Sequence, residues 1–408
     1  MLKLRSISKI DFDNFTQDHE SSSHFMQTSH WGEFEKVTNH TTPYYLGLVN
    51  EQEEIVAATL LLEEHLPMNN CSLYAPRGFV IEYKNHRLLT IFTEKLKDFA
   101  KHKKAISLRI NPAISYKNVE ETNEILQTLK KLGYKKQTKI KLLEYNYIID
   151  LTKDLNEITN NYSDNIKEKL NSTETYDIEL SIGTSKDLEE LFNLQENKNK
   201  KTYETLYDIF NNNEHAKIKL FLGKLHITKT MKTLEKDLRR INNQMSIIPI
   251  DNLEKTSKQK LENLKKQREI ISNDLEKFKK YKLEYGNYLT ISANLMMEHN
   301  NTVWIISEAS NEILKETNLT YRIYDEYIKY YKDQGFNYFK QLSPIENNPD
   351  INEFKKEFGG EFTEYIGEYN LITNKPMYFI QNNIIPIFSS KKKDGENNGT
   401  SETNWKRI

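Results

Sequence analysis

Apolar residues recur with heptad spacing between Ile227 and Lys282, and the pattern is interrupted once, at Ile248-Pro249. Before the interruption the gaps alternate between four and three residues, which places the apolar side chains on one seam of a helix. The seam resumes beyond the interruption, although Arg268 and Lys282 occupy positions on it. Its apolar members are Ile227, Met231, Leu234, Leu238, Ile241, Met245, Leu261, Leu264, Ile271, Leu275 and Phe278.

Pro249 decides what shape this seam takes. Proline cannot continue the first helix, and it pushes the preceding Ile248 out of the helical region, so we expect the chain to reverse there. The pattern predicts an antiparallel helical hairpin, a coiled-coil arm with about 20 to 30 residues in each helix, projecting from a globular body. The two helices could instead pack into the core of a bundle, but the narrow seam and the dense charge favour a projecting arm.

The rest of the chain alternates between strand and helix patterns. Tyr44–Val49 and Ile55–Leu62 read as a hairpin, His86–His102 as a helix and Ala105–Ile110 as a strand, an order that predicts an α/β layered domain. A similar order follows the arm and indicates two related halves, the second interrupted by the arm. The remaining predicted elements are Ser72–Tyr74, Ile178–Ile182, Ala216–Leu222, Tyr288–Glu298, Thr302–Ile306 and Asn337–Leu342 as strands, and Glu121–Leu132, Ser185–Glu196, Thr202–Asn211 and Thr320–Gln334 as helices.

We therefore predict an α/β (α+β) protein with two domains and an inserted arm. The predicted ranges are 1–158 for the first domain, 159–225 with 286–388 for the second, and 226–285 for the arm. Residues 389–408 contain a polar run with almost no apolar residues and are predicted to be a disordered tail.

Charge is distributed unevenly along the 408 residues. The net charge is −1, but 226–285 holds 15 Lys and Arg against 9 Asp and Glu, a balance of +6 that leaves −7 for the remainder. A basic arm on a mildly acidic body could bind a polyanion. A solvated, lysine-rich helix surface would give the same count.

Several kinds of chemistry are not indicated. The 13 glycines form no phosphate-binding loop of the Walker or dinucleotide type, the 10 histidines have no zinc-type spacing, and no G-x-S-x-G is present, so we expect neither a nucleotide cofactor nor a metal. The single cysteine, Cys71, rules out an internal disulfide. No signal peptide or transmembrane pattern is found, which predicts a cytoplasmic protein that could associate with the inner face of the membrane.

Three separated motifs carry the strongest functional signal. They are Phe25-x-Gln27-x-x-x-Trp31-Gly32-x-x-x-Lys36, then Leu73-Tyr74-Ala75-Pro76-Arg77-Gly78, then Phe354-Lys355-x-x-Phe358-Gly359 followed by Glu364-Tyr365-Ile366-Gly367-Glu368. Together with Leu108-Arg109-Ile110-Asn111-Pro112 and the inserted hairpin, their order resembles the FemABX family of aminoacyltransferases, which build the interpeptide bridge of bacterial peptidoglycan.

The resemblance implies a pair of GNAT-like acyltransferase domains with a cleft between them. It implies an aminoacyl-tRNA donor, charged with glycine or serine, and an acceptor amine on the peptide stem or bridge of a lipid-linked peptidoglycan precursor. The missing glycine-rich pyrophosphate loop fits a tRNA donor better than an acyl-CoA donor.

The same resemblance nominates the site residues. Lys355, the candidate catalytic residue, would lie near the reacting ester or the acceptor peptide, and Lys36 near the phosphates or carboxylates of the precursor. Trp31 and Phe354 would wall the site, and Tyr74 belongs to the second motif. For each lysine the alternative is an ordinary surface charge.

Three further residues are candidates for substrate binding. Arg77 could hold a carboxylate or phosphate with two hydrogen bonds, or it could order its own turn through an internal salt bridge. Arg109 lies inside a predicted strand, which favours a structural role. Asn111 stands where the family often has Asp, so a carboxylate general base is unavailable at that point.

The chain also departs from the family in its second half. The strand end after Trp304, usually aromatic and rich in glycine, is here Ile305-Ile306-Ser307-Glu308-Ala309-Ser310, which indicates an altered pocket because glycine permits close approach of a ligand. The alternative function is therefore a divergent, catalytically altered paralogue that binds a bridge-forming enzyme through the arm, by homo- or hetero-association. A coiled-coil scaffold without a small-molecule site is disfavoured by the motifs at both ends of the chain.

Overall fold

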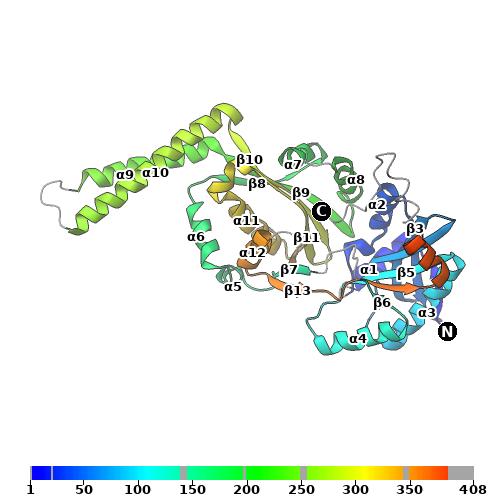
Figure 1. The fold of residues 1–408 in the computed structure, drawn as a ribbon. Coiled ribbons are helices and arrows are strands. Elements are labelled where there is room, and N and C mark those ends of the chain that lie inside the picture. The colour runs from blue at the N-terminus through cyan, green and yellow to red at the C-terminus, as the bar shows by residue number, and fades with distance from the viewer. Residues whose placement is uncertain are drawn as a thin grey trace.

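The computed structural model describes residues 2–19, 22–137, 145–195, 199–248, 255–342 and 349–384. It consists of two seven-stranded sheets with helices packed on them and a long helical arm (Figure 1). The predicted α/β class is confirmed. Within the described residues, no helix combines the length and the apolar character needed to cross a bilayer. The predicted tail at 389–408 lies outside the described residues.

The first sheet has the strand order β1-β2-β3-β4-β5-β14-β6. Neighbouring strands are antiparallel except β4 and β5, which are parallel and are connected by helix α3. The strands are β1 Lys3–Ser6, β2 Thr42–Val49, β3 Ile55–Leu66, β4 Asn70–Arg77, β5 Ala105–Pro112, β14 Tyr369–Ile372 and β6 Lys135–Lys136.

The second sheet has the order β8-β9-β10-β11-β12-β7-β13. Here too a single pair of neighbours is parallel, β11 and β12, and a helical connection through α11 joins them. The strands are β8 Ile178–Gly183, β9 Ala216–His226, β10 Tyr288–His299, β11 Thr302–Ser310, β12 Tyr338–Leu342, β7 Tyr145–Asp150 and β13 Glu361–Glu364.

The two sheets therefore share one topology, as the repeated order of elements in the sequence predicts. They also exchange a strand. β7, which precedes the second half in the chain, pairs with β12 and β13 of the second sheet. β14, which follows the second half, pairs with β5 and β6 of the first. β7 falls within the predicted first domain, 1–158, but belongs to the second sheet. β14 falls within the predicted range 286–388 of the second domain but belongs to the first sheet.

The helices pack in layers around these sheets (Figure 1). α3 and α4 cover the outer face of the first sheet, and α6, α11 and α12 cover one face of the second. A third core lies between the sheets and includes residues of α1, α2, α7 and α8. The helices are α1 Lys9–Asp18, α2 Ser29–Asn39, α3 His86–His102, α4 Val119–Lys131, α5 Leu155–Asn160, α6 Asp164–Ser172, α7 Leu188–Leu194, α8 Lys200–Phe210, α9 Ile227–Ser246, α10 Lys255–Tyr285, α11 Leu319–Asp333, α12 Pro349–Glu357 and α13 Lys375–Phe379. The short helices are the 3-10 helices η1 Phe25–Gln27, η2 Ser185–Asp187 and η3 Glu312–Thr317 and the π-helical η4 Ile380–Ile384.

The first two sequence motifs pack against each other. The Gln27 side chain donates to the Pro76 carbonyl (2.7 Å) and accepts from the Leu60 backbone N–H (2.9 Å). A Cβ on Gly78 would lie 2.8 Å from the Gln27 amide nitrogen, and one on Gly32 would lie 2.4 Å from the Tyr45 hydroxyl. A larger residue at either position would require the neighbouring side chain to shift.

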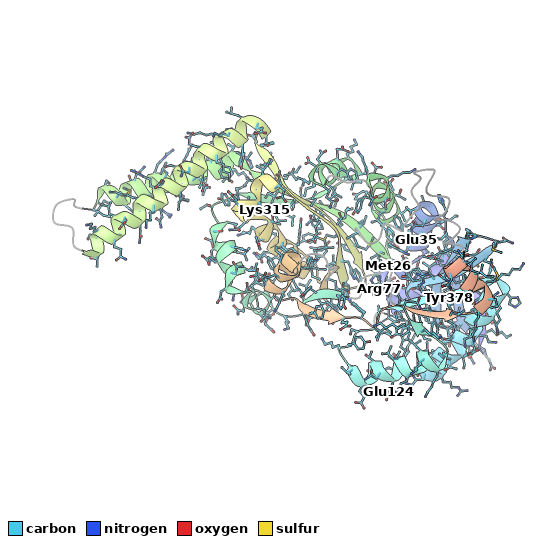
Figure 2. All side chains as sticks on the ribbon, viewed as in Figure 1. Met26, Glu35, Arg77, Glu124, Lys315 and Tyr378 are labelled. Carbon is cyan, nitrogen blue, oxygen red and sulfur yellow. The ribbon has the colours of Figure 1, made fainter. Side chains whose placement is uncertain are left out.

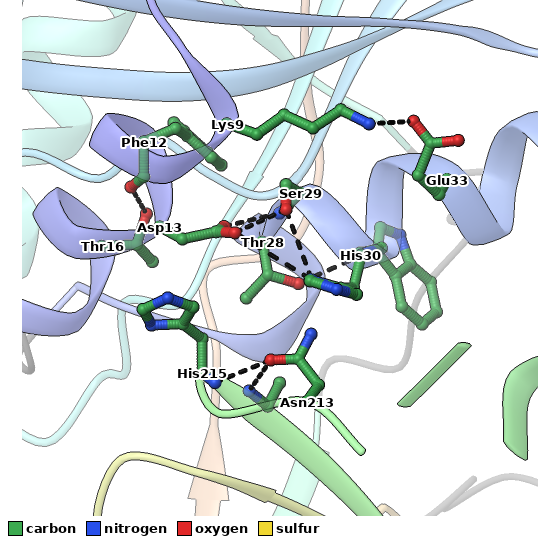
Figure 3. Close-up of polar contacts among 12 residues, drawn as sticks. Lys9, Phe12, Asp13, Thr16, Thr28, Ser29, His30, Glu33, Asn213 and His215 are labelled. Atoms are coloured by element: carbon green, nitrogen blue, oxygen red, sulfur yellow. Dashed lines mark hydrogen bonds and ion pairs between the residues drawn. The ribbon is translucent and has the colours of Figure 1, made fainter. Parts of the chain in front are cut away.

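Helix α2 is held at its N-terminus by α1. The Asp13 carboxylate accepts hydrogen bonds from the backbone N–H (2.7 Å) and the hydroxyl of Ser29 (Figure 3). A carboxylate at this end satisfies an N–H group that the helix leaves unpaired and interacts favourably with the helix dipole. An ion pair between Lys9 and Glu33 joins the two helices again (2.5 Å).

The arm consists of α9 and α10, which lie side by side and extend away from the sheets (Figure 1). Seam residues Leu234, Leu275 and Phe278 are buried at its base in the core of the second sheet, whereas Arg268 and Lys282 are exposed. The reversal predicted at Pro249 falls outside the described residues. The helical hairpin is thus continuous with β9 and β10, and its base is part of the second core.

This attachment predicts a difference between two leucines of the arm. Leu234 is 2% exposed and Leu283 is 89% exposed. Replacing Leu234 with Ala should lower the free energy of unfolding by about 2 to 5 kcal/mol, because it leaves a cavity in the core. Leu283→Ala should change it by less than about 0.5 kcal/mol. Denaturant unfolding measures both, and equal effects would show that the base of the arm is not packed as described.

Candidate functional site

A cavity of about 580 Å³ opens between the second sheet and the helices α11 and α12. Strands β10 and β11 supply its floor, η3 forms one rim, and Phe354 and Lys355 enter from α12. The third sequence motif therefore contributes to a cavity. Every described residue that lines it belongs to the second half of the chain.

Two irregularities in the sheet shape the floor of this pocket. The register of β10 shifts against β9 between Thr290 and Ser292, and against β11 between Leu295 and Met296. Bulges of this kind bend a strand and redirect its side chains. Ser292 and Asn294 lie between the two shifts and line the pocket.

The floor residues are fixed by hydrogen bonds. The Ser292 hydroxyl lies 3.3 Å from the Tyr327 hydroxyl, and the Asn294 side chain accepts from the Ala309 backbone N–H (3.2 Å). Both groups are buried. A ligand in this pocket would therefore meet a polar floor that is already oriented.

Lys355 is a buried cationic group of the pocket, whereas Lys315 lies on the η3 rim, 3.6 Å from Glu312. The Lys355 side chain is only 2% exposed. Burial lowers the pKa of the Lys355 ammonium below its ordinary value, and the negative charge of Glu308 opposes that shift in part. A cation held away from bulk water interacts strongly with negative charge, because the local dielectric is lower than that of water.

Phe354 belongs to an aromatic cluster behind Lys355. Its ring centroid lies 5.1 Å from that of Tyr321, 5.0 Å from that of Tyr324 and 5.1 Å from that of Phe358. These contacts fix α12 against α11. The cluster thus sets the position of Lys355, the next residue along the chain.

A second group of candidate residues lies on one face of the first sheet. Arg109 of β5 lies opposite Tyr74 of β4 and Asn370 of β14 in the strand register. Glu368, which is fully buried, accepts a hydrogen bond from the Tyr74 hydroxyl (3.2 Å) and lies 3.8 Å from the Arg109 guanidinium. We call Tyr74, Arg109, Asn111, Glu368 and Asn370 the first-sheet polar face.

Asn111 is the exceptional member of this face. It is fully buried, and neither its amide nitrogen nor its amide oxygen has a hydrogen-bond partner among the described residues. Buried polar groups in native proteins are nearly always paired, so an unpaired amide needs an explanation. A ligand that offers both a donor and an acceptor would satisfy it.

The remaining candidates belong to neither group, although Arg77 follows Pro76, the register partner of Asn111, and its charge acts on Tyr74. Arg77 is buried between the two sheets (Figure 2), has φ of 52°, and packs with its guanidinium 5.1 Å from the Tyr365 ring centroid. Trp31 is 2% exposed, packs in the core between the sheets and is not among the described residues that line the pocket with Phe354, so its part in substrate binding stays a prediction. Lys36 is exposed on α2, 3.9 Å from Glu33, and does not line the pocket.

Sequence patterns missed several residues of the site. Glu368 stands in the third motif, but nothing in that motif indicates that its carboxylate joins the face of Arg109. Tyr324 and Tyr327 have the spacing of neighbours on one helix face, which is also the spacing of core residues. Glu308 stands out in the sequence only as a departure from a glycine-rich strand end. Among the described residues, no cluster of three or more His, Cys, Asp or Glu could hold a metal ion.

Because the Lys355 ammonium is buried, we expect its charge to lower the free energy of unfolding. Because its pKa in the folded protein is lowered, the folded state binds fewer protons than the unfolded chain as the pH rises toward 10.5, the ordinary lysine value. Stability of the wild type should therefore rise over that range. Lys355→Met, which has similar bulk and no charge, should melt above the wild type at pH 7, and the difference should shrink as the pH rises. Thermal melting at several pH values tests this, and a variant that melts lower at pH 7 would contradict it.

Comparison with known proteins places these features in a family. The model of the FemAB family matches residues 7–384. Aminoacyltransferase FemA of Staphylococcus epidermidis is 23% identical over 414 residues, covering 93% of this chain and 98% of that protein. Lipid II:glycine glycyltransferase of Staphylococcus aureus is 24% identical over 427 residues, covering 95% and 96%.

A solved structure shares the fold. The crystal structure of FemX superposes with a TM-score of 0.76 at 19% sequence identity, covering 93% of this chain and 99% of that chain. The resemblance inferred from the motifs is thereby confirmed. The two relatives above are an aminoacyltransferase and a glycyltransferase by name, and this chain belongs to the FemAB family.

Proposed function

We propose that the protein transfers glycine or serine from an aminoacyl-tRNA to an amine on the peptide stem or bridge of a lipid-linked peptidoglycan precursor. The observation that carries the proposal is the buried, cationic Lys355 in the pocket of a FemAB-family chain. The names of the relatives, FemA and lipid II:glycine glycyltransferase, support the reaction class. The donor and the amino acid are the proposed part.

The reaction needs placement more than activation. The amine nitrogen of the acceptor attacks the ester carbonyl carbon, the ester C–O bond breaks, and a proton lost by the amine ends on the ribose oxygen that leaves. Orienting the two reactants can supply up to about 7 to 11 kcal/mol of the barrier. The Lys355 ammonium would stabilise the negative oxygen that develops on the carbonyl, a contribution of about 3 kcal/mol.

The first-sheet polar face is the proposed seat of the acceptor peptide. Peptide groups present one donor and one acceptor each, which are the partners that the unpaired Asn111 amide lacks among the described residues. Arg109 and Glu368 add opposite charges beside it. In this assignment Asn111 binds the peptide and does not act as a base.

The arm is the proposed contact for the body of the tRNA. Residues 226–285 include 15 basic and 9 acidic residues, and this positive balance favours binding of a polyanion. Helix α10 of the arm also contacts the pocket rim, since the Tyr281 hydroxyl donates to the Ile313 carbonyl (3.3 Å) and Lys277 lies 3.9 Å from Glu316. A tRNA on the arm would therefore lie beside η3, the rim on which Lys315 sits (Figure 2).

One observation favours a second candidate, a paralogue that binds a bridge-forming enzyme through the arm. Ile247, Ile270 and Leu283 are apolar arm residues that are 78%, 61% and 89% exposed. The variants Lys355→Ala and Ile270→Asp distinguish the two candidate functions. A cellular effect that survives the first change and is lost with the second would favour the binding role.

The transfer assay tests the proposed function directly. Purified protein is incubated with lipid-linked precursor and tRNA charged with glycine, serine or alanine, and amino acid incorporation into the peptide is measured. Lys355→Ala should lower kcat about 100- to 1,000-fold, the range for loss of one oxyanion-stabilising group, while its melting temperature shows that it folds. No incorporation from any of the three tRNAs by the wild type would refute the proposal.

Neutralising charge on the arm tests the tRNA contact. Lys258, Lys265 and Lys266 are exposed on α10, and Lys101, Lys130 and Lys131 are exposed on α3 and α4. Changing the first three to Gln should raise KM for aminoacyl-tRNA and flatten the dependence of log KM on log salt by about 0.7 to 0.9 for each phosphate that the arm no longer neutralises. The second three, changed in the same way, serve as the charge-matched control. Equal effects of both sets would remove the arm from tRNA binding.

A further inference from the structure

The pocket of Lys355 also contains the carboxylate of Glu308, in addition to Glu312 and Lys315, which lie 3.6 Å apart on its rim. Glu308 lies near the end of β11, opposite Asn294 of β10 in the strand register, and lines the cavity. Its neighbours in sequence, Ser307 and Ala309, are buried, whereas Glu308 itself is exposed to the cavity and solvent. Glu308 therefore presents a carboxylate at the open side of the pocket.

This carboxylate is near enough to influence groups on two helices. Its negative charge raises the pKa of Lys355 on α12, against the effect of burial. It also raises the pKa values of Tyr324 and Tyr327 on α11, in the same direction as burial. The pocket thus holds a buried cation and an accessible anion.

We propose that Glu308 binds the α-ammonium group of the amino acid being transferred, while Lys355 faces its ester carbonyl. The inference rests on the proposed function and specifies how the donor is recognised. In an α-aminoacyl ester the amino nitrogen is separated from the carbonyl carbon by one atom. A carboxylate and an ammonium in one pocket complement the two ends of that unit.

The pairing has a chemical consequence for the donor. A free α-amino group has an ordinary pKa of about 7.7 to 8.0, and a nearby carboxylate favours its charged form. A protonated amine cannot act as a nucleophile. The α-amine of the bound donor therefore cannot attack an aminoacyl ester in place of the acceptor amine. The positive charge also withdraws electrons from the ester carbonyl and makes it easier to attack.

The recognition also gives the pocket a basis for selection. A donor whose α-nitrogen is acetylated loses the charge, and a donor with a hydroxyl in that place loses both the charge and two of the hydrogen-bond donors. Either change would leave the Glu308 carboxylate without its cationic partner. Discrimination against such donors is therefore the property that Glu308 should control.

The test compares glycyl-tRNA with glycolyl-tRNA, in which a hydroxyl replaces the α-amine, and with N-acetylglycyl-tRNA. In the wild type, kcat/KM should be highest for glycyl-tRNA. Glu308→Gln should lower kcat/KM for glycyl-tRNA about 10- to 100-fold, the usual effect of losing a hydrogen bond to a charged group, and leave the value for glycolyl-tRNA unchanged. Glu308→Asp should restore part of the loss. Glu120→Gln, at an exposed position of α4, is the matched control and should behave as wild type.

Two results would overturn the inference. One is an equal loss with glycyl-tRNA and glycolyl-tRNA, which would mean that Glu308 acts by positioning Lys355. The other is no change in the preference for the free amine.

A binding measurement separates this inference from the proposed function. Glycine methyl ester and methyl glycolate are titrated into the wild type and into Glu308→Gln, and binding is followed by NMR shifts of the small molecules. A preference for the amine ester that the wild type shows and Glu308→Gln lacks supports the inference, even if no transfer is detected. Equal binding of both esters by both proteins refutes it even if transfer occurs.

Discussion

The exchange of strands β7 and β14 is the constraint on which the rest of the structure depends. Each exchanged strand is an interior strand with hydrogen-bonded neighbours on both sides, β14 between β5 and β6, and β7 between β12 and β13. Removing either would leave backbone N–H and C=O groups of its neighbours unpaired. The two halves cannot separate without breaking both sheets, so the protein behaves as one body despite its internal repeat.

The same exchange fixes the two candidate sites relative to each other. After α12 the chain forms β13 in the second sheet and then crosses to β14 in the first. Lys355 lies before this crossing and Glu368 at its end. At the crossing the Tyr365 hydroxyl accepts from the Asn146 side chain of β7 (3.1 Å), and its ring lies against Arg77. One short segment thus carries a residue of the pocket and a residue of the first-sheet polar face.

Sequence patterns predicted the parts of this architecture that are local. The helix at His86–His102 has the predicted bounds, and the apolar seam at the base of the arm is buried as its spacing requires. β13 and β14 have only four residues each and were not predicted, because so short a strand has no measurable alternation, and sheet membership depends on distant partners. The motif residues Gln27, Gly32 and Gly78 pack against one another or against Tyr45, so part of the family signature reports packing. The motifs could not show that Trp31 lies in the core whereas Phe354 lines the pocket.

Both sites carry costs that packing alone does not explain. The fold holds the Lys355 ammonium where burial disfavours its charge, and it buries the Asn111 amide with no partner among the described residues. Apolar side chains of similar size would serve stability better at both places. Because these groups are already desolvated and oriented, a ligand that brings negative charge to the first, or a donor and an acceptor to the second, binds without meeting that cost again. These two unfavourable polar positions are therefore the ones that a developing carbonyl oxyanion and a peptide group would stabilise.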